Sequence, residues 1–199
     1  KGEIIKTTPF EMVLIIRDYM NGFERGNSLL SLCGLNCGLC PMRLGGHCGG
    51  CGNGNQSCRI ARCSLEHGGV EYCCECVGYP CEKYERIDEY DSFITHRRQK
   101  ADLEKVIAVG VERYNREQEE KIRLLSFLLD NFNDGRRRSF FCTAVNLLEL
   151  HEIHEALDEI RAGAGLALLP LRERSSYVSE VLQRIAGRRN VDLRLRKKA

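Results

Sequence analysis

The sequence predicts a mainly α-helical protein in which a small, irregular cysteine-rich metal-binding module is flanked by an N-terminal helix and a C-terminal helical bundle with a short terminal strand. Eleven of the twelve cysteines lie between Cys33 and Cys81. Apolar residues recur at intervals of three and four after that segment. The composition, 43% hydrophobic and 29% charged, is that of a globular protein rather than a disordered or membrane one. We expect divisions at 1–30, 31–85 and 86–199.

The N-terminal segment predicts an amphipathic helix. Thr8, Pro9 and Glu11 form a helix start, with threonine as the N-cap, proline at the first helical position and glutamate three residues after the cap. Apolar residues then recur at helical spacing until Gly22. The helix, of about 13 residues, is too short to span a bilayer. We expect it to pack on the rest of the fold.

The segment 33–81 has too few apolar residues to fold by burial alone. It holds eleven of the nineteen glycines, and its aliphatic residues are few and scattered. Ordering about fifty residues costs more conformational entropy than these side chains offset. A structural zinc site supplies roughly 10–16 kcal/mol of apparent binding energy that appears as folding energy. We therefore expect bound metal to hold this segment.

The spacing of the cysteines is typical of a metal site. Pairs separated by two residues let two thiolates reach one tetrahedral ion from a tight turn. Cys48-Gly-Gly-Cys51-Gly resembles a zinc knuckle, whereas the proline after Cys40 is typical of ferredoxin runs. The sequence favours zinc and leaves [4Fe–4S] clusters as the alternative. The predicted ligands are ten cysteines: Cys33, Cys37, Cys40, Cys48, Cys51, Cys58, Cys63, Cys73, Cys76 and Cys81.

The spacing leaves the grouping of these thiols open. The eleven clustered cysteines fill two four-cysteine sites with three over, or three sites if one histidine joins them. His47 and His67 are the candidates for that histidine. The run Cys33-x3-Cys37-x2-Cys40 also matches the cluster triad of radical S-adenosylmethionine enzymes. That interpretation is disfavoured, because more cysteines and then helices follow instead of a large α/β barrel.

Other chemistry-bearing residues are expected to be structural. His151 and His154 are three residues apart, whereas the zinc-protease motif places its histidines four apart, so we expect both on the exposed side of a helix. Cys142, between Phe141 and Val145, is expected to be a buried thiol. The sequence shows no acid–base pair, phosphate loop or nucleotide motif. No catalytic residue is assigned, and whether the protein is an enzyme stays open.

The sequence after Cys81 predicts helices. A first apolar stripe over 103–132 indicates one long helix, or two with a break near Asn115. A second helical stretch covers 141–160. A last helix covers about 175–186, with Gly187 as its C-cap.

The C-terminal segment combines an alternating pattern with basic residues. Val191, Leu193 and Leu195 alternate with charged residues, which predicts a short strand. The net charge of +2 arises after residue 81. We expect a solvated end rather than a nucleic-acid site. The basic residues are Arg188, Arg189, Arg194, Arg196, Lys197 and Lys198.

Composition also bounds the location and the partners. No secretory leader opens the sequence, so we expect a cytoplasmic protein with reduced cysteines. The cysteine-rich segment is neutral and has few aromatics for base stacking, which disfavours nucleic acid. Another protein is the expected partner, no membrane association is expected, and the oligomeric state stays open.

Three motifs in the segment 31–85 resemble a known family. They are Cys33-Gly-Leu-Asn-Cys37-Gly-Leu-Cys40-Pro, Cys58-Arg-Ile-Ala-Arg-Cys63 and Cys73-Cys74-Glu-Cys76-Val-Gly-Tyr-Pro-Cys81-Glu-Lys. The segment is similar to the cysteine-rich domain of unknown function number 3795, with ten cysteines in the family's order. Asn55 stands where many relatives have a cysteine, and Cys74 has no regular counterpart. The resemblance implies a metal-binding module, with zinc or iron–sulfur, and no established reaction.

Overall fold

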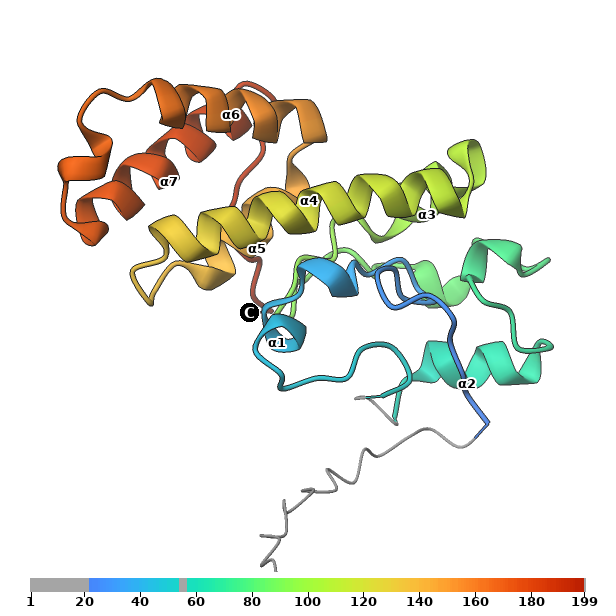
Figure 1. The fold of residues 1–199 in the computed structure, drawn as a ribbon. Coiled ribbons are helices and arrows are strands. Elements are labelled where there is room, and N and C mark those ends of the chain that lie inside the picture. Colours follow the sequence, from blue (N-terminus) through green and yellow to red (C-terminus); the bar gives the residue numbers. More distant parts are fainter. Residues whose placement is uncertain (1–21, 54–56, 199) are drawn as a thin grey trace, which may run out of the picture.

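The computed structural model describes residues 22–53 and 57–198, and within these ranges the chain is mainly helical, as predicted (Figure 1). The helix expected to start at Thr8 lies outside the described residues. In the described part, Leu30 and Asn36 form an isolated antiparallel bridge, and no other strand pairing is present. No helix found there is both long and apolar enough to cross a membrane.

Helices of very different length follow one another along the chain. The longest is α4, with 22 residues, and the shortest is α1, with four. The α-helices are α1 (Pro41–Leu44), α2 (Arg59–Glu66), α3 (Gln99–Val109), α4 (Val111–Phe132), α5 (Arg138–Leu147), α6 (Leu150–Ala162) and α7 (Leu171–Gly187). Four short 3-10 turns are η1 (Cys37–Leu39), η2 (Cys73–Glu75), η3 (Glu82–Tyr84) and η4 (Leu166–Leu168) among the described residues.

Two of the predicted helical stretches are divided at positions other than those expected. The first is broken at Gly110, whose φ of +80° lies outside the helical region, and not near Asn115, which lies inside α4. The second is broken after α5, because Leu148 is extended and Glu149 starts α6 with a capping box to Glu152. Gly187 ends α7 as its last residue and is not the cap.

The helices α4 to α7 share one apolar core. Figure 1 shows α6 and α7 packed side by side, with α4 extending from them towards the cysteine-rich module. Leu125, Phe141 and Leu157 are among its fully buried members. Cys142 is 2% exposed in this core, which confirms the prediction of a buried thiol. His151 and His154 are exposed on α6, as predicted.

The cysteine-rich module docks on this helical region through polar contacts that are buried. Its turn η1 packs against α4 and α5, and η2 packs against α3. The Asn36 amide donates to Gln118 of α4, and the Gln99 amide of α3 donates to the Cys33 carbonyl at 3.2 Å. Nearby, the Lys121 ammonium is buried and donates to the Leu148 carbonyl at 2.7 Å. These contacts position the cysteine-bearing loops.

The predicted terminal strand is not formed among the described residues. The alternation of apolar and charged residues does correspond to alternating burial, because Leu193 is buried while Asp192 and Arg194 are exposed. However, the carbonyls of Asp192 and Arg194 accept hydrogen bonds from the Arg97 guanidinium instead of from a neighbouring strand. Arg196 is held in turn by the buried carboxylate of Asp91. The prediction was wrong because side chains satisfy this backbone.

Candidate metal centre

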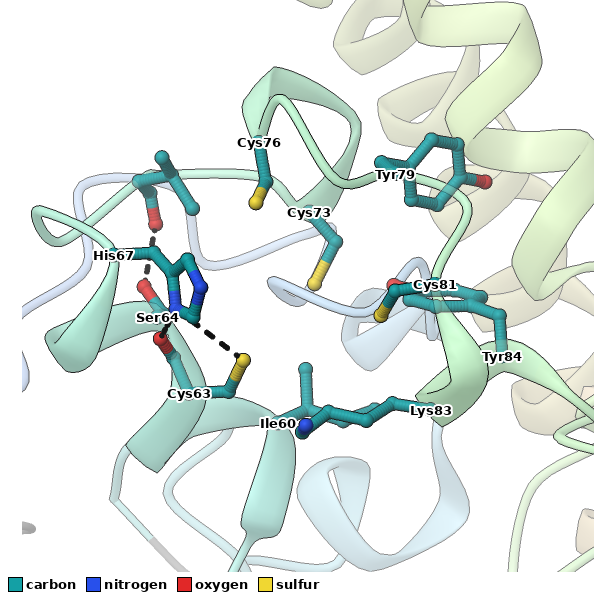
Figure 2. A pocket seen from close by; sticks show the side chains of 11 residues that line it. Ile60, Cys63, Ser64, His67, Cys73, Cys76, Tyr79, Cys81, Lys83 and Tyr84 are labelled. Atoms are coloured by element: carbon teal, nitrogen blue, oxygen red, sulfur yellow. Dashed lines mark hydrogen bonds between the residues drawn. The ribbon is translucent and has the colours of Figure 1, made fainter.

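Four of the predicted ligands surround one small cavity. Cys63 comes from α2, Cys73 from η2, Cys76 directly follows η2, and Cys81 directly precedes η3. Figure 2 shows the sulfur atoms of all four pointing into a shared space. The cavity has a volume of about 30 Å³, which is enough for a species of about the size of one water molecule.

Local hydrogen bonds fold the chain into the turn that presents Cys73 and Cys76. The Glu75 carboxylate accepts from the backbone N–H of Glu71 at 3.0 Å and of Tyr72 at 3.1 Å. The N–H of Cys76 donates to the Cys73 carbonyl at 3.1 Å. This is the tight turn that the two-residue spacing predicts, with both thiols on the side of the cavity.

Aromatic and aliphatic side chains form the wall behind the thiols. Ile60 and Val70 line the cavity, as do Tyr79 and Tyr84, whose rings meet edge to face with centroids 4.9 Å apart. The Tyr84 hydroxyl is buried and has no partner of standard hydrogen-bond geometry in the described part of the chain. Burial raises the pKa of Cys73, and the Tyr84 hydroxyl lies close enough to that thiol to offset part of the rise. The hydroxyl is therefore available to donate to a Cys73 thiolate.

The thiols of the cavity are electrostatically coupled. Burial, followed by the charges of Cys33, Cys81 and Cys63, raises the pKa of Cys73 to about 12. Near neutral pH such a thiol keeps its proton unless a cation stabilises the thiolate. Binding of a metal ion therefore releases protons, and its affinity falls as the pH falls.

His67 stands at the edge of the cavity beside Cys63. Its Nδ1 lies 3.6 Å from the Cys63 sulfur and 2.8 Å from the Cys63 carbonyl oxygen, and the residue is exposed. In the described ranges, Cys63, Glu66 and His67 form the one group of three metal-type ligand atoms within 4.8 Å of one another. No three of the four cavity thiols lie that close together in these ranges.

The other six predicted ligands lie outside this cavity. Cys33, Cys37, Cys51 and Cys58 do not line it. Cys40 is the N-cap of α1. After the larger effect of burial, its charge raises the pKa of Cys142 and of Cys37. The Cys48 sulfur accepts the N–H of Gly50 at 3.4 Å.

Two further candidates are also outside the cavity. Cys74 packs with Tyr72 and Leu103 although it directly follows the cavity thiol Cys73. His47 is exposed beside Gly45, and it does not line the cavity.

Sequence reasoning missed part of the wall. Lys83 and Tyr84 line the cavity. Both directly follow Cys81-Glu82, so their position beside a predicted ligand was the signal that could have identified them. Ile60 precedes Cys63 by one helical turn, which places both on one face of α2. Comparison with protein-family models, with curated proteins and with solved structures finds no match for this chain.

Proposed function

We propose that the protein is a metal-binding protein in which Cys63, Cys73, Cys76 and Cys81 ligate a zinc ion. The observation that carries the proposal is the convergence of four thiols, from separate pieces of chain, on one cavity of about 30 Å³. Four thiolates at tetrahedral positions are the set that structural zinc prefers. The small volume supports a single ion.

A closed set of four thiolates assigns a structural role to this centre. It leaves no open coordination position for a water or a substrate, which a catalytic zinc site requires. The protein residues supply the thiolates, the Tyr84 hydroxyl as a donor to sulfur, and the positive charge of Lys83 at the cavity wall. The free energy of metal binding then stabilises the fold of the module.

Metal content of the protein, purified without oxygen, tests the proposal. We expect zinc in the unaltered chain and reduced zinc in Cys76→Ser. Cys74→Ser is a matched control, because Cys74 is also partly buried and lies two residues away but does not line the cavity. A folded protein without metal, or equal zinc in both variants, would contradict the proposal.

An iron–sulfur cluster is the second candidate, and one observation favours it. In a tetrahedral zinc site with Zn–S bonds of about 2.3 Å, the sulfurs lie roughly 3.8 Å apart. In the described ranges no three of the four cavity thiols lie within 4.8 Å of one another. A cluster of several irons separates its cysteines more widely than one ion does.

The same oxygen-free preparation decides between the two candidates. If the protein contains iron with matching acid-labile sulfide and absorbs visible light, the centre is an iron–sulfur cluster and not a zinc site. The protein would then be a redox protein or enzyme component of anaerobic metabolism. A colourless protein that contains no iron or sulfide would exclude the cluster.

We propose further that the module is an interaction platform for another protein in the cytoplasm, and that it belongs to the domain of unknown function 3795 family. Exposed apolar side chains support a protein partner. Val77, which directly follows Cys76, is fully exposed, and Phe93, eight residues after the end of the module, is 65% exposed. Equal recovery of bound proteins by the unaltered chain and by a Val77→Asp, Phe93→Asp variant would contradict the platform.

A further inference from the structure

We infer that Cys33, Cys37, Cys51 and Cys58 form a second metal centre, separate from the first, which binds a soft cation through four thiolates. The inference rests on the proposed function and extends it to a two-centre module. It assigns eight of the ten predicted ligands to two sites and leaves Cys40 and Cys48 outside both.

The first turn of the module presents Cys33 and Cys37 to the same interior. The bridge between Leu30 and Asn36 closes a tight turn that contains Cys33, and η1 begins at Cys37. The Cys33 sulfur accepts from the Gln99 amide at 3.2 Å and lies 3.3 Å from the Ser31 hydroxyl. Donors aimed at sulfur are the groups that orient metal-binding thiolates.

The loop after α1 returns Cys51 to this turn. The backbone N–H of Cys51 donates to the Cys37 sulfur, and the N–H of Leu32 donates to the Cys51 sulfur. Cys37 and Cys51 also line one cavity, of about 70 Å³, together with Arg25 and Arg43. The two thiols thus lie at one cavity although they are fourteen positions apart in the sequence.

Cys58 completes the group from the start of α2. It packs, with Cys51, against one small apolar cluster that includes Phe23, Leu32 and Ala61. It also lies close enough to Cys33 and Cys51 for its charge to raise the pKa of each, after the larger effect of burial. Burial, followed by the charges of Cys51 and Cys33, raises the pKa of Cys37 to about 12. Cys51 therefore shares a cavity with Cys37 and an apolar cluster with Cys58, and the turn that contains Cys33 leads directly into η1 at Cys37.

The two groups are neighbours, but they are not one site. The N–H of Cys73 donates to the Leu32 carbonyl at 2.9 Å, so the backbone beside Cys33 contacts the backbone of a thiol of the first cavity. None of Cys33, Cys37, Cys51 and Cys58 lines the cavity that the first four thiols surround. This geometry is that of two adjacent centres, with Cys73 in the first and Cys33 in the second.

Titration of the metal-free chain with Zn²⁺, read by native mass spectrometry, tests the inference. We expect about two ions per chain for the unaltered protein and about one, half the content, for Cys37→Ser with Cys51→Ser. The pair Cys63→Ser with Cys76→Ser should likewise retain one ion. The matched control is Cys48→Ser with Cys74→Ser, which changes two thiols outside both groups and should retain both ions.

The outcomes separate the two proposals. One ion in the unaltered chain, lost only in Cys63→Ser with Cys76→Ser, would overturn the second centre and leave the first in place. No ion in any chain would overturn both. X-ray absorption of the unaltered zinc-loaded protein covers variants that fail to fold. Four sulfurs per zinc with no nearby metal supports two centres, whereas a short metal–metal distance would show one shared cluster and overturn the inference.

Discussion

The helical region and the cysteine-rich module differ in how much apolar side chain they bury. In the helical region, α4 to α7 contribute a continuous apolar core with fully buried leucine, isoleucine, valine and phenylalanine side chains. Most of the described buried apolar residues of the module belong to two small clusters, one of them shared with α3 and α4, and cysteines pack around both. Leu39 joins the large core instead. The first region can fold by burial, whereas for the second the proposed function supplies the missing free energy through thiolate ligation.

The comparison also explains the position of the polar contacts. Arg98 of the segment before α3 pairs with Asp102 at 3.4 Å and with Glu149 at 2.8 Å, beside the buried Lys121. Such buried ion pairs specify one arrangement more than they add stability. They join the start of α3 to the start of α6 beside α4, so they fix how these helices pack.

The largest expected effect is the loss of module structure when metal is removed. A strong chelator removes roughly 10–16 kcal/mol of apparent binding energy per structural zinc. We expect amide hydrogen exchange to become fast over 22–53 and 57–85 while α4 to α7 stay protected. Unchanged protection of the module after complete metal removal would contradict the comparison.

The second prediction perturbs the helical core, by creating a cavity in it, and leaves the thiols unchanged. Leu157→Ala removes a buried side chain of α6 and should lower the free energy of unfolding by about 2–5 kcal/mol in urea denaturation. Leu168→Ala is the control, because Leu168 is 89% exposed and its change should cost less than about 0.5 kcal/mol. Both variants should keep the metal content of the unaltered chain. Metal loss in the first alone would show that the thiols depend on the helical core.

A smaller effect is expected at the contact between the two regions. Gly34 has φ +87°, and a Cβ there would lie 2.2 Å from the Gln99 carbonyl oxygen of α3. Gly34→Ala should therefore lower stability by about 3 kcal/mol, since backbone strain and a steric clash add. Gly135→Ala has the same strain, with φ +89° and open space, and should cost only about 1 kcal/mol. Equal losses in thermal unfolding would mean that the docking contact does not matter.

The smallest expected effect is a change in affinity without a change in fold. Tyr84→Phe removes the hydroxyl beside Cys73 and keeps the ring, so zinc affinity measured by chelator competition should fall about tenfold. Tyr90→Phe, at a partly exposed tyrosine outside the cavity, is the control and should leave affinity unchanged. Identical affinities would assign Tyr84 to packing alone.

Local patterns in the sequence predicted much of the fold. Helical spacing predicted the mainly helical class, the buried Cys142 and the exposed His151, because these features depend on residues within a few turns of one another. The break at Gly110 and the absence of a terminal strand were not predicted. The first depends on one backbone torsion angle, and the second on the Arg97 side chain, which lies about a hundred residues from the carbonyls that it binds.

The sequence by itself determined that the segment 33–81 carries thiols at ligand spacing and few, scattered apolar residues. Only the tertiary structure placed Cys63, Cys73, Cys76 and Cys81 around one cavity and connected Cys37 to Cys51. The physical reason is that spacing constrains neighbours within one turn, such as Cys73 and Cys76. Joining different turns depends on long-range backbone contacts, such as that between Leu32 and Cys73, that no local pattern encodes.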